Sequence, residues 1–378
     1  MKPIMNDKKI VNSWALFDWA NSAYALVIST AIFPIYFTAN TPEIVHILGL
    51  EFTNSSLYTF AVSFSYIIIA FMSPILSGIA DYSGRKKYFL KIFTILGSLA
   101  CSALWFFDGA GTYWIGTLGF IIATIGFAGA LVFYNAYLPE IATEDQYDLV
   151  SAKGFAYGYV GSVILLIIIL FMISKHDMFG FPTEKTPIRI GFLLVGVWWL
   201  FFGFISFKGL PNDLNKEKRD NIVQKGFQEI KNVFAELQDR PNIKRFLASF
   251  FFCSAGVQTV IYVASIFAKD ELAFESTELI TIILLLQLVG IIGAFLFAYI
   301  SKQTTNKTSL IISIVIWIII CVTAFFVSTK PQFYMIAATV GLVMGGIQSM
   351  SRSTYSKLLD EGEDDTTISI SGNAFLGM

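Results

Sequence analysis

The sequence predicts an all-α polytopic membrane protein, on the evidence of its composition and of the way its charges are distributed. Of the 378 residues, 55% are apolar and 14% are charged, whereas soluble globular domains usually carry about 25% charged residues. Segments such as 112–139 and 308–329 contain no Lys, Arg, Asp or Glu, and each is long enough to cross a hydrocarbon core about 30 Å thick. These observations exclude a soluble enzyme, a nucleic-acid-binding protein and a disordered regulator.

Ten apolar segments, each bounded by charged or turn residues, predict ten transmembrane helices. Helices are expected because lipid offers no partner to open backbone groups, and the continuous apolar runs do not alternate as barrel strands do. The first segment is too long for a cleaved signal and contains Asp18, so it is predicted to be a permanent span. The predicted spans are residues 14–38, 57–80, 88–107, 112–138, 154–174, 189–208, 243–268, 278–300, 308–328 and 332–358.

The basic residues predict the orientation of these spans. If the N-terminus is cytoplasmic, 21 of the 26 Lys and Arg residues fall on the cytoplasmic side of the membrane. Loops on that side of a membrane protein are enriched in Lys and Arg. The sequence therefore predicts a multi-pass protein of the cytoplasmic (plasma) membrane with both termini in the cytoplasm.

One long polar segment divides the spans into a group of six and a group of four. Within it, apolar residues from Val223 to Leu237 recur at helical spacing between charged residues, which predicts an amphipathic helix too polar to span. This helix is expected either at the membrane interface or packed on the protein itself, and the sequence favours neither. The predicted parts are an N-terminal six-helix bundle (1–208), a cytoplasmic linker (209–242), a C-terminal bundle of four helices (243–359) and a cytoplasmic tail (360–378).

The turn between the second and third spans carries an informative motif. In the segment 74–87, PILSGIADYSGRKK, an acidic residue is followed by a glycine and then by cations. An ordinary positive-inside loop explains the cations but not this order. The motif resembles the signature loop of the major facilitator superfamily, in which Ser77 stands where a glycine is expected. The residues of this signature loop are Ser77, Asp81, Gly84, Arg85 and Lys86.

Other segments resemble one branch of that superfamily, the vacuole-effluxer-like family, which is related to autophagy-associated amino-acid exporters and includes bacterial relatives. The resemblance covers about residues 14–359 and implies a major-facilitator-like bundle of twelve spans that works by alternating access. Only ten are seen here, so we expect a C-terminally truncated chain, with a genuine ten-span form as the alternative. The segments that carry the resemblance are WALFDWANSAY (14–24), FPIYF (33–37), FYNAYLPEIA (133–142), GVQTVIYVASIF (256–267) and GGIQSMSRS (345–353).

Polar residues recur at helical spacing in the first, seventh and tenth spans, and the fourth contains a polar pair. Because polar faces in lipid turn inward, and because these four spans line the cavity of the resembled fold, we expect them to line a transport cavity. Each residue has the alternative role of a hydrogen-bonding contact between helices. The predicted cavity residues are Asp18, Asn21, Tyr134, Asn135, Gln258, Tyr262, Gln348, Arg352 and Tyr355.

Two of these residues carry opposite charges and lie near the cytoplasmic ends of their spans. Asp18 belongs to the first span and Arg352 to the tenth. One hypothesis is that they pair across the two halves and close a cytoplasmic gate. The alternative is that Arg352 extends to the membrane surface, as long basic side chains do.

The combined features predict a transporter rather than an enzyme. The sequence contains no phosphate-binding Gly-x4-Gly-Lys-(Ser/Thr) motif, and its two histidines fall in predicted outside loops. We expect a secondary active or facilitative carrier of small polar solutes, with amino acids suggested by the resemblance. The alternative is a truncated, transport-inactive membrane protein. The expected partners are a small polar solute, a coupling proton or sodium ion, and the lipid bilayer. We expect no cofactor, no metal and no nucleic acid. The protein is expected to be a monomer.

Overall fold

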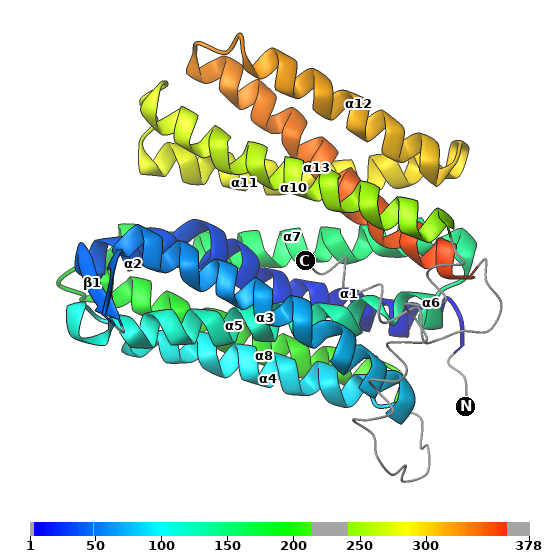
Figure 1. Ribbon diagram of the computed structural model, residues 1–378, viewed down its shortest axis with the longest axis horizontal. Helices are drawn as coiled ribbons and strands as arrows, with labels where there is room; N and C mark the ends of the chain where they lie inside the picture. Colours follow the sequence, from blue (N-terminus) through cyan, green and yellow to red (C-terminus); the bar gives the residue numbers. More distant parts are fainter. Residues whose placement is uncertain (1–3, 48, 214–240, 361–378) are drawn as a thin grey trace.

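The computed structural model describes residues 4–47, 49–213 and 241–360. This part of the chain folds almost wholly into helices that run side by side along the long axis of the molecule (Figure 1). The first span is a composite of α1 (Lys8–Ala23), a π-helical segment (Tyr24–Ile32) and α2 (Phe33–Asn40). The other long helices are α3 (Asn54–Ser83), α4 (Lys86–Ala103), α5 (Tyr113–Asn135), α7 (Tyr147–Ser174), α8 (Lys185–Gly209), α10 (Pro241–Asp270), α11 (Ser276–Gln303), α12 (Asn306–Ala324) and α13 (Lys330–Asp360).

Local sequence explains how the first span begins and bends. Asp7 caps α1, since its side chain accepts hydrogen bonds from the backbone N–H groups of Lys9 and Ile10. The π-helical segment then interrupts the regular hydrogen bonding for nine residues, and Pro34 lies at the start of α2, where its missing N–H costs little. Long π-helical stretches are rare, and short ones are frequent at functional sites.

A small hairpin follows the first span and precedes α3. Its strands are β1 (Ile44–Ile47) and β2 (Leu50–Thr53), which pair antiparallel with Ile44 opposite Thr53 and Ile47 opposite Leu50. Gly49 lies in the turn with a φ of 80°, a left-handed conformation that glycine adopts without strain. The sequence patterns did not predict this hairpin.

The helices form two groups (Figure 1). The N-terminal half consists of α1–α8, with a short α6 (Leu138–Ile141), and the C-terminal half of α10–α13. We call the end at which α1 begins, α6 lies and α13 ends the inner end, and the end that carries β1 and β2 the outer end. Helix α7 lies between the halves and contacts both α11 and α13. Toward the inner end, α10 and α13 approach the N-terminal half, whereas they diverge from it toward the outer end.

Glycines allow helices to approach closely, both across the halves, where α11 meets α7, and within the C-terminal half, where α13 meets α11. A Cβ at Gly290 of α11 would lie 3.1 Å from the ring of Tyr159 on α7, and one at Gly341 of α13 would lie 2.7 Å from the Leu286 carbonyl of α11. These separations leave no room for a side chain. Small residues at such contacts are typical of packed membrane helices.

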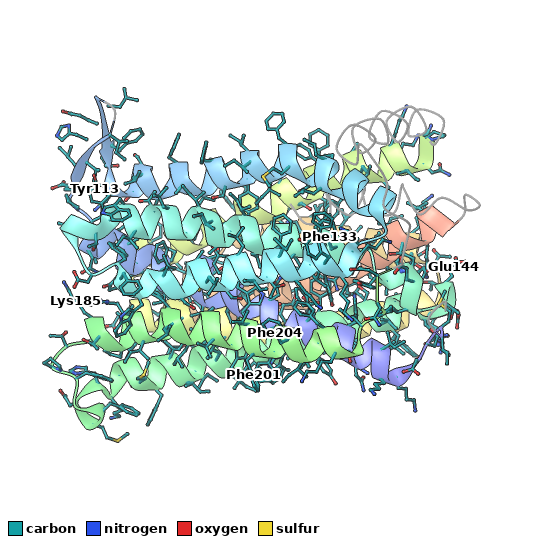
Figure 2. The ribbon with its side chains drawn as sticks, turned by 90° about the horizontal axis from the view of Figure 1, so that it is seen from below. Tyr113, Phe133, Glu144, Lys185, Phe201 and Phe204 are labelled. Carbon is teal, nitrogen blue, oxygen red and sulfur yellow. The ribbon has the colours of Figure 1, made fainter. Side chains whose placement is uncertain are left out.

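The outer surface of the bundle is apolar along its length and charged at its ends. Figure 2 shows the N-terminal half from the side away from the C-terminal half, with Phe201 and Phe204 pointing outward from α8 and with Lys185 and Glu144 near opposite ends. Phe201 is 58% exposed and Phe204 44%. Nine helical segments of the described residues are long and apolar enough to cross a membrane, and α10 runs alongside them (Figure 1). This is the surface of a multi-pass membrane protein.

The predicted spans agree with the helices, with boundary errors of a few residues. The largest is at the start of the fifth span, predicted at residue 154, because α7 begins at Tyr147. The predicted amphipathic helix of the linker and the tail beyond residue 360 lie outside the described residues. The predicted all-α membrane bundle is confirmed.

Candidate functional site

A buried ion pair joins the two halves near the inner end. Asp18 is one turn from the end of α1 and Arg352 lies in the last third of α13, and Arg352 Nη1 is 3.2 Å from Asp18 Oδ2. The side chains are 4% and 6% exposed, respectively. The predicted pairing is therefore present in the structure. At this burial each ion needs the other, because a charge removed from water without a partner is costly.

Aromatic rings and a hydroxyl complete the surroundings of this pair. The guanidinium carbon of Arg352 lies 4.0 Å from the ring centre of Phe155, 5.1 Å from that of Tyr134 and 5.3 Å from that of Trp14. Such distances permit cation–π attraction, which is strongest where water is excluded. The Tyr134 hydroxyl donates to Asp18 Oδ2 over 2.9 Å, so the carboxylate accepts from two donors.

The rings are held in place by contacts within the N-terminal half. Trp14 and Tyr134 stack with their centres 4.5 Å apart, and the indole N–H of Trp14 donates to the Tyr134 carbonyl over 2.9 Å. Gly154 on α7 faces this group: a Cβ there would lie 2.8–3.0 Å from Trp14, from the Tyr134 hydroxyl and from Asp18 Oδ2. The site thus depends on the absence of a side chain at Gly154.

A second polar contact between the halves lies nearer the middle of the bundle. The Tyr159 hydroxyl of α7 donates to Gln348 Oε1 of α13 over 2.5 Å. Asn21, which follows Asp18 by one turn on α1, is fully buried, and neither its amide nitrogen nor its oxygen has a hydrogen-bond partner in the described structure. Asn135 is 4% exposed, and its side-chain oxygen also lacks one. Buried amides are usually satisfied, so the Asn21 amide and the Asn135 oxygen are unusual in lacking a partner among the described residues.

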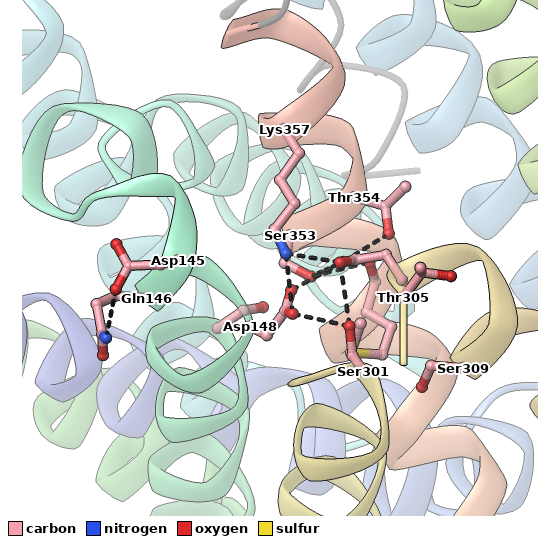
Figure 3. Close-up of polar contacts among 12 residues, drawn as sticks. Asp145, Gln146, Asp148, Ser301, Thr305, Ser309, Ser353, Thr354 and Lys357 are labelled. Atoms are coloured by element: carbon pink, nitrogen blue, oxygen red, sulfur yellow. Dashed lines mark hydrogen bonds and ion pairs between the residues drawn. The ribbon is translucent and has the colours of Figure 1, made fainter. Parts of the chain in front are cut away.

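A third cluster closes the inner end, as Figure 3 shows. Asp148, at the start of α7 and 7% exposed, receives hydrogen bonds from both ends of the α11–α12 turn and an ion pair from α13. Ser301 Oγ donates to Asp148 Oδ2 over 2.8 Å, and Asn306 Nδ2 donates to Oδ1 over 2.8 Å. Lys357 Nζ is 3.0 Å from Asp148 Oδ2 and 2.6 Å from Asn306 Oδ1. These three donors compensate for the burial of the carboxylate.

A hydrogen bond from a side chain of α7 to the backbone of α13 also joins the two halves. The Ser151 hydroxyl donates to the Ser349 carbonyl over 2.7 Å, and both residues are fully buried. Together, the Asp18 site, this bond and the Asp148 cluster connect the two halves over residues 349–357 of α13. The structure is therefore closed at its inner end.

The signature loop links helices within the N-terminal half. Gly84 separates α3 from α4 and has a φ of 68°. Glycine adopts this left-handed conformation without strain, which explains why a glycine occupies this position. Lys86 pairs with Glu140 of α6 over 2.6 Å, while Arg85 is exposed. The Asp213 carboxylate accepts hydrogen bonds from the backbone N–H groups of Lys87 and Tyr88 at the start of α4. These hydrogen bonds lower the pKa of Asp213, but its burial has the larger effect and raises the pKa above the usual value for Asp.

The remaining predicted residues are placed as follows. Tyr355 is fully buried against α10 in the C-terminal half, in a cluster with Ile243, and its ring centre lies 6.3 Å from that of Phe246. The side chains of Ser77, Asp81, Gln258 and Tyr262 lie outside the described residues. The structure thus brings together Asp18, Tyr134 and Arg352 in one site, with Asn21 one turn away.

Sequence reasoning missed several residues of these clusters. Asp148, Tyr159 and Phe155 belong to the fifth span, in which no polar stripe was identified, and Lys357 counted only as a cytoplasmic charge. One signal was available for Asp148, since an acid follows a polar turn and begins a long apolar helix without a basic neighbour in sequence. Its partners are 153–209 residues away, so the pairing required the fold.

Comparisons with known protein sequences agree with this architecture. A family described as "Vacuole effluxer Atg22 like" matches residues 6–367. The chain is 33% identical over 350 residues to an uncharacterized MFS-type transporter, YxiO, of Bacillus subtilis, covering 92% of this chain and 80% of that protein. It is 23% identical to autophagy-related protein 22 of Kluyveromyces lactis, covering 87% of this chain and 73% of that one.

Solved structures show the same fold at low sequence identity. The human organic anion transporter MFSD10 aligns with a TM-score of 0.69 at 11% identity, over 99% of this chain and 91% of that one. The major facilitator superfamily transporter FucP, in its outward conformation, aligns with a TM-score of 0.66 at 14% identity, over 98% of this chain and 97% of that one. The fold of the chain is that of major facilitator transporters.

Proposed function

Because the chain belongs to the Atg22-like vacuole effluxer family and is a major-facilitator-type transporter, we propose that it carries a small polar solute by alternating access. The observation that carries this proposal is the buried Asp18–Arg352 pair, which connects the two halves and would have to break for the inner end to open. Carriers of this kind work by rocking two halves about a site near the bilayer midplane. The diverging helices at the outer end and the joined inner end fit one state of that cycle (Figure 1).

In this proposal the inner end faces the cytoplasm, in the plasma membrane, with both chain termini on that side. The distribution of Lys and Arg supports this orientation. The Asp18–Arg352 pair and the Asp148–Lys357 cluster then form a cytoplasmic gate. Both halves of the path come from one chain, so a monomer is sufficient.

The solute is proposed to bind one turn further from the cytoplasm than this gate. Asn21 offers an unpartnered donor and acceptor there, and Tyr159 and Gln348 bridge the halves at a similar level. Amino acids are the first solutes to test, given the family. A proton or a sodium ion is the proposed coupling ion, and Asp18 is the carboxylate that would bind it.

Flux into proteoliposomes tests the proposal with a panel of amino acids and sugars. We expect uptake of at least one solute, a fall of about tenfold or more for Asp18→Asn and for Arg352→Gln, and partial recovery in the charge-swapped Asp18→Arg, Arg352→Asp double variant. Matched controls are Asp145→Asn and Arg245→Gln, since both residues are exposed. Flux that is insensitive to the single changes would contradict the gate. No flux of any solute would favour the alternative of a transport-inactive membrane protein.

A further inference from the structure

The Arg352 side chain comes from the C-terminal half but lies in a site built entirely by the N-terminal half. The site consists of Trp14 and Asp18 from α1, Tyr134 from α5 and Phe155 from α7. Trp14 and Tyr134 are fully buried and Asp18 is 3% exposed. We call these four residues the cation site.

The chemistry of the cation site is that of a receptor for an organic cation. Three aromatic rings lie within 5.3 Å of the guanidinium carbon, and aromatic faces attract cations most strongly where water is excluded. The carboxylate of Asp18 supplies the opposite charge. The Tyr134 hydroxyl, which belongs to the N-terminal half, also donates to this carboxylate, so one of its two donors stays in place when Arg352 leaves.

Opening of the inner end would empty this site. If α13 moves away from α1 and α7, Arg352 moves with it, while all four residues of the cation site stay with the N-terminal half. Asp18 would then face the opened path without its partner. A carboxylate in such a setting favours a replacement cation.

We propose that the vacated cation site binds the guanidinium group of a cationic solute that arrives from the inner side, and that this solute and Arg352 exclude each other. The proposal rests on the proposed function, because it requires the two halves to separate. The group that fills the site in the closed state is itself a guanidinium, so size and planarity are already matched. Arg352 acts as an internal substitute for the solute, and solute binding opposes closure.

Chemical replacement of Arg352 tests the site directly. The variant Arg352→Ala is purified in detergent, and its unfolding temperature is measured with ethylguanidinium chloride and with ethylurea, a neutral analogue of similar shape. We expect ethylguanidinium alone to raise the unfolding temperature, with no rise in the Arg352→Ala, Asp18→Asn double variant. Adding Phe155→Leu, which retains an apolar side chain, should weaken the apparent affinity about tenfold. Equal shifts with both compounds, or a shift that survives the loss of Asp18, would overturn the proposal.

A second measurement keeps Arg352 in place, in case Arg352→Ala does not fold. Ser349 is fully buried between α13 and α7 at the inner end, so Ser349→Cys reports opening through its reaction with a thiol reagent. The parent protein, with Cys101, Cys253 and Cys321, gives the background. Ethylguanidinium should speed the labelling of Cys at this position, whereas ethylurea should not. Equal labelling rates with the two compounds would overturn the proposal.

Flux measurements separate this inference from the proposed function. If the protein carries solutes and ethylguanidinium fails to inhibit that flux, the cation site has no part in solute binding and the inference fails alone. If ethylguanidinium binds in an Asp18-dependent manner but no solute crosses the membrane, the proposed function fails alone. Inhibition of flux by ethylguanidinium but not by ethylurea supports both.

Discussion

The carboxylate of Asp18 and the guanidinium of Arg352 lie 334 residues apart in sequence and form a contact at the interface of the two halves. Spacing along each helix was enough to select both residues as inward-facing, because few charges occur within the spans. The spacing of residues along a helix could not predict which side chains surround Asp18 and Arg352. The ring of Phe155 on α7, which lies closest to the guanidinium, is one of 37 Phe residues in the chain, and nothing in the sequence distinguishes it from those that face lipid.

Gly154 gives a prediction at the scale of one residue. In Gly154→Ala the new methyl would meet Trp14, Tyr134 and Asp18 at 2.8–3.0 Å, so we expect a loss of stability of about 1–3 kcal/mol together with reduced flux. Thermal unfolding in detergent measures the first effect. The matched control is Gly256→Ala on α10, where no atom lies within 4 Å of the added Cβ. Equal unfolding temperatures for the two variants would show that α7 can move to accommodate the methyl.

Asp148 gives a second prediction at this scale. Asp148→Asn keeps the shape of the side chain but removes the charge that attracts Lys357, and charge-assisted hydrogen bonds are worth about 1.5–3 kcal/mol. We expect the equilibrium between closed and open inner ends to shift about tenfold toward the open form. Faster thiol labelling of Ser349→Cys measures it. Asp145→Asn, on an exposed residue in the preceding turn (Figure 3), is the control and should leave the labelling rate unchanged.

At the scale of elements, the spans were predictable because each is a continuous apolar run, and their ends because charges and turn residues bound them. The hairpin of β1 and β2 was not predictable. Its ten residues, from Ile44 to Thr53, are too few, and polar and apolar residues are too mixed among them, to show the alternation typical of a strand. The π-helical segment was missed for a different reason: Tyr24–Ile32 differs from an α-helix in hydrogen bonding rather than in composition. Register within a span therefore requires the structure.

The connection between α4 and α6 gives a prediction at the scale of elements. Lys86 and Glu140 pair over 2.6 Å with side chains 11% and 33% exposed. We expect Lys86→Met to lower the free energy of unfolding by about 1–2 kcal/mol, and the same change at the exposed neighbour Arg85 to have no effect. A double-mutant cycle with Glu140→Gln measures the coupling. Purely additive effects in that cycle would show that the pair does not stabilise the fold.

At the scale of the whole molecule, the composition was enough to predict a membrane protein and the motifs were enough to suggest the family. Apart from the Asp18–Arg352 pair, the contacts between the halves were not predictable. Helix α7 contacts the C-terminal half through Asp148, Ser151 and Tyr159, and Asp148 and Ser151 precede the apolar run from which the fifth span was predicted. Helices that are distant in sequence contact one another through side-chain packing. The periodicity of residues along one helix does not predict which other helix it packs against.

Orientation gives a prediction for the whole molecule. Glu51 in β2 and Asp145 before α7 are both exposed and lie toward opposite ends of the structure. In intact cells, a membrane-impermeant thiol reagent should label Glu51→Cys, whereas Asp145→Cys should react only after permeabilisation. The reverse pattern would invert the proposed topology and place the gate on the outer side.

Arg352 and Lys357 are both carried by α13, five positions apart, and each reaches a different acid of the other half. If α13 moves as a rigid helix, it cannot break one of these ion pairs and keep the other. We therefore expect the two ion pairs to break together, so that weakening either one makes the breaking of both easier and the inner end has two states, closed and open.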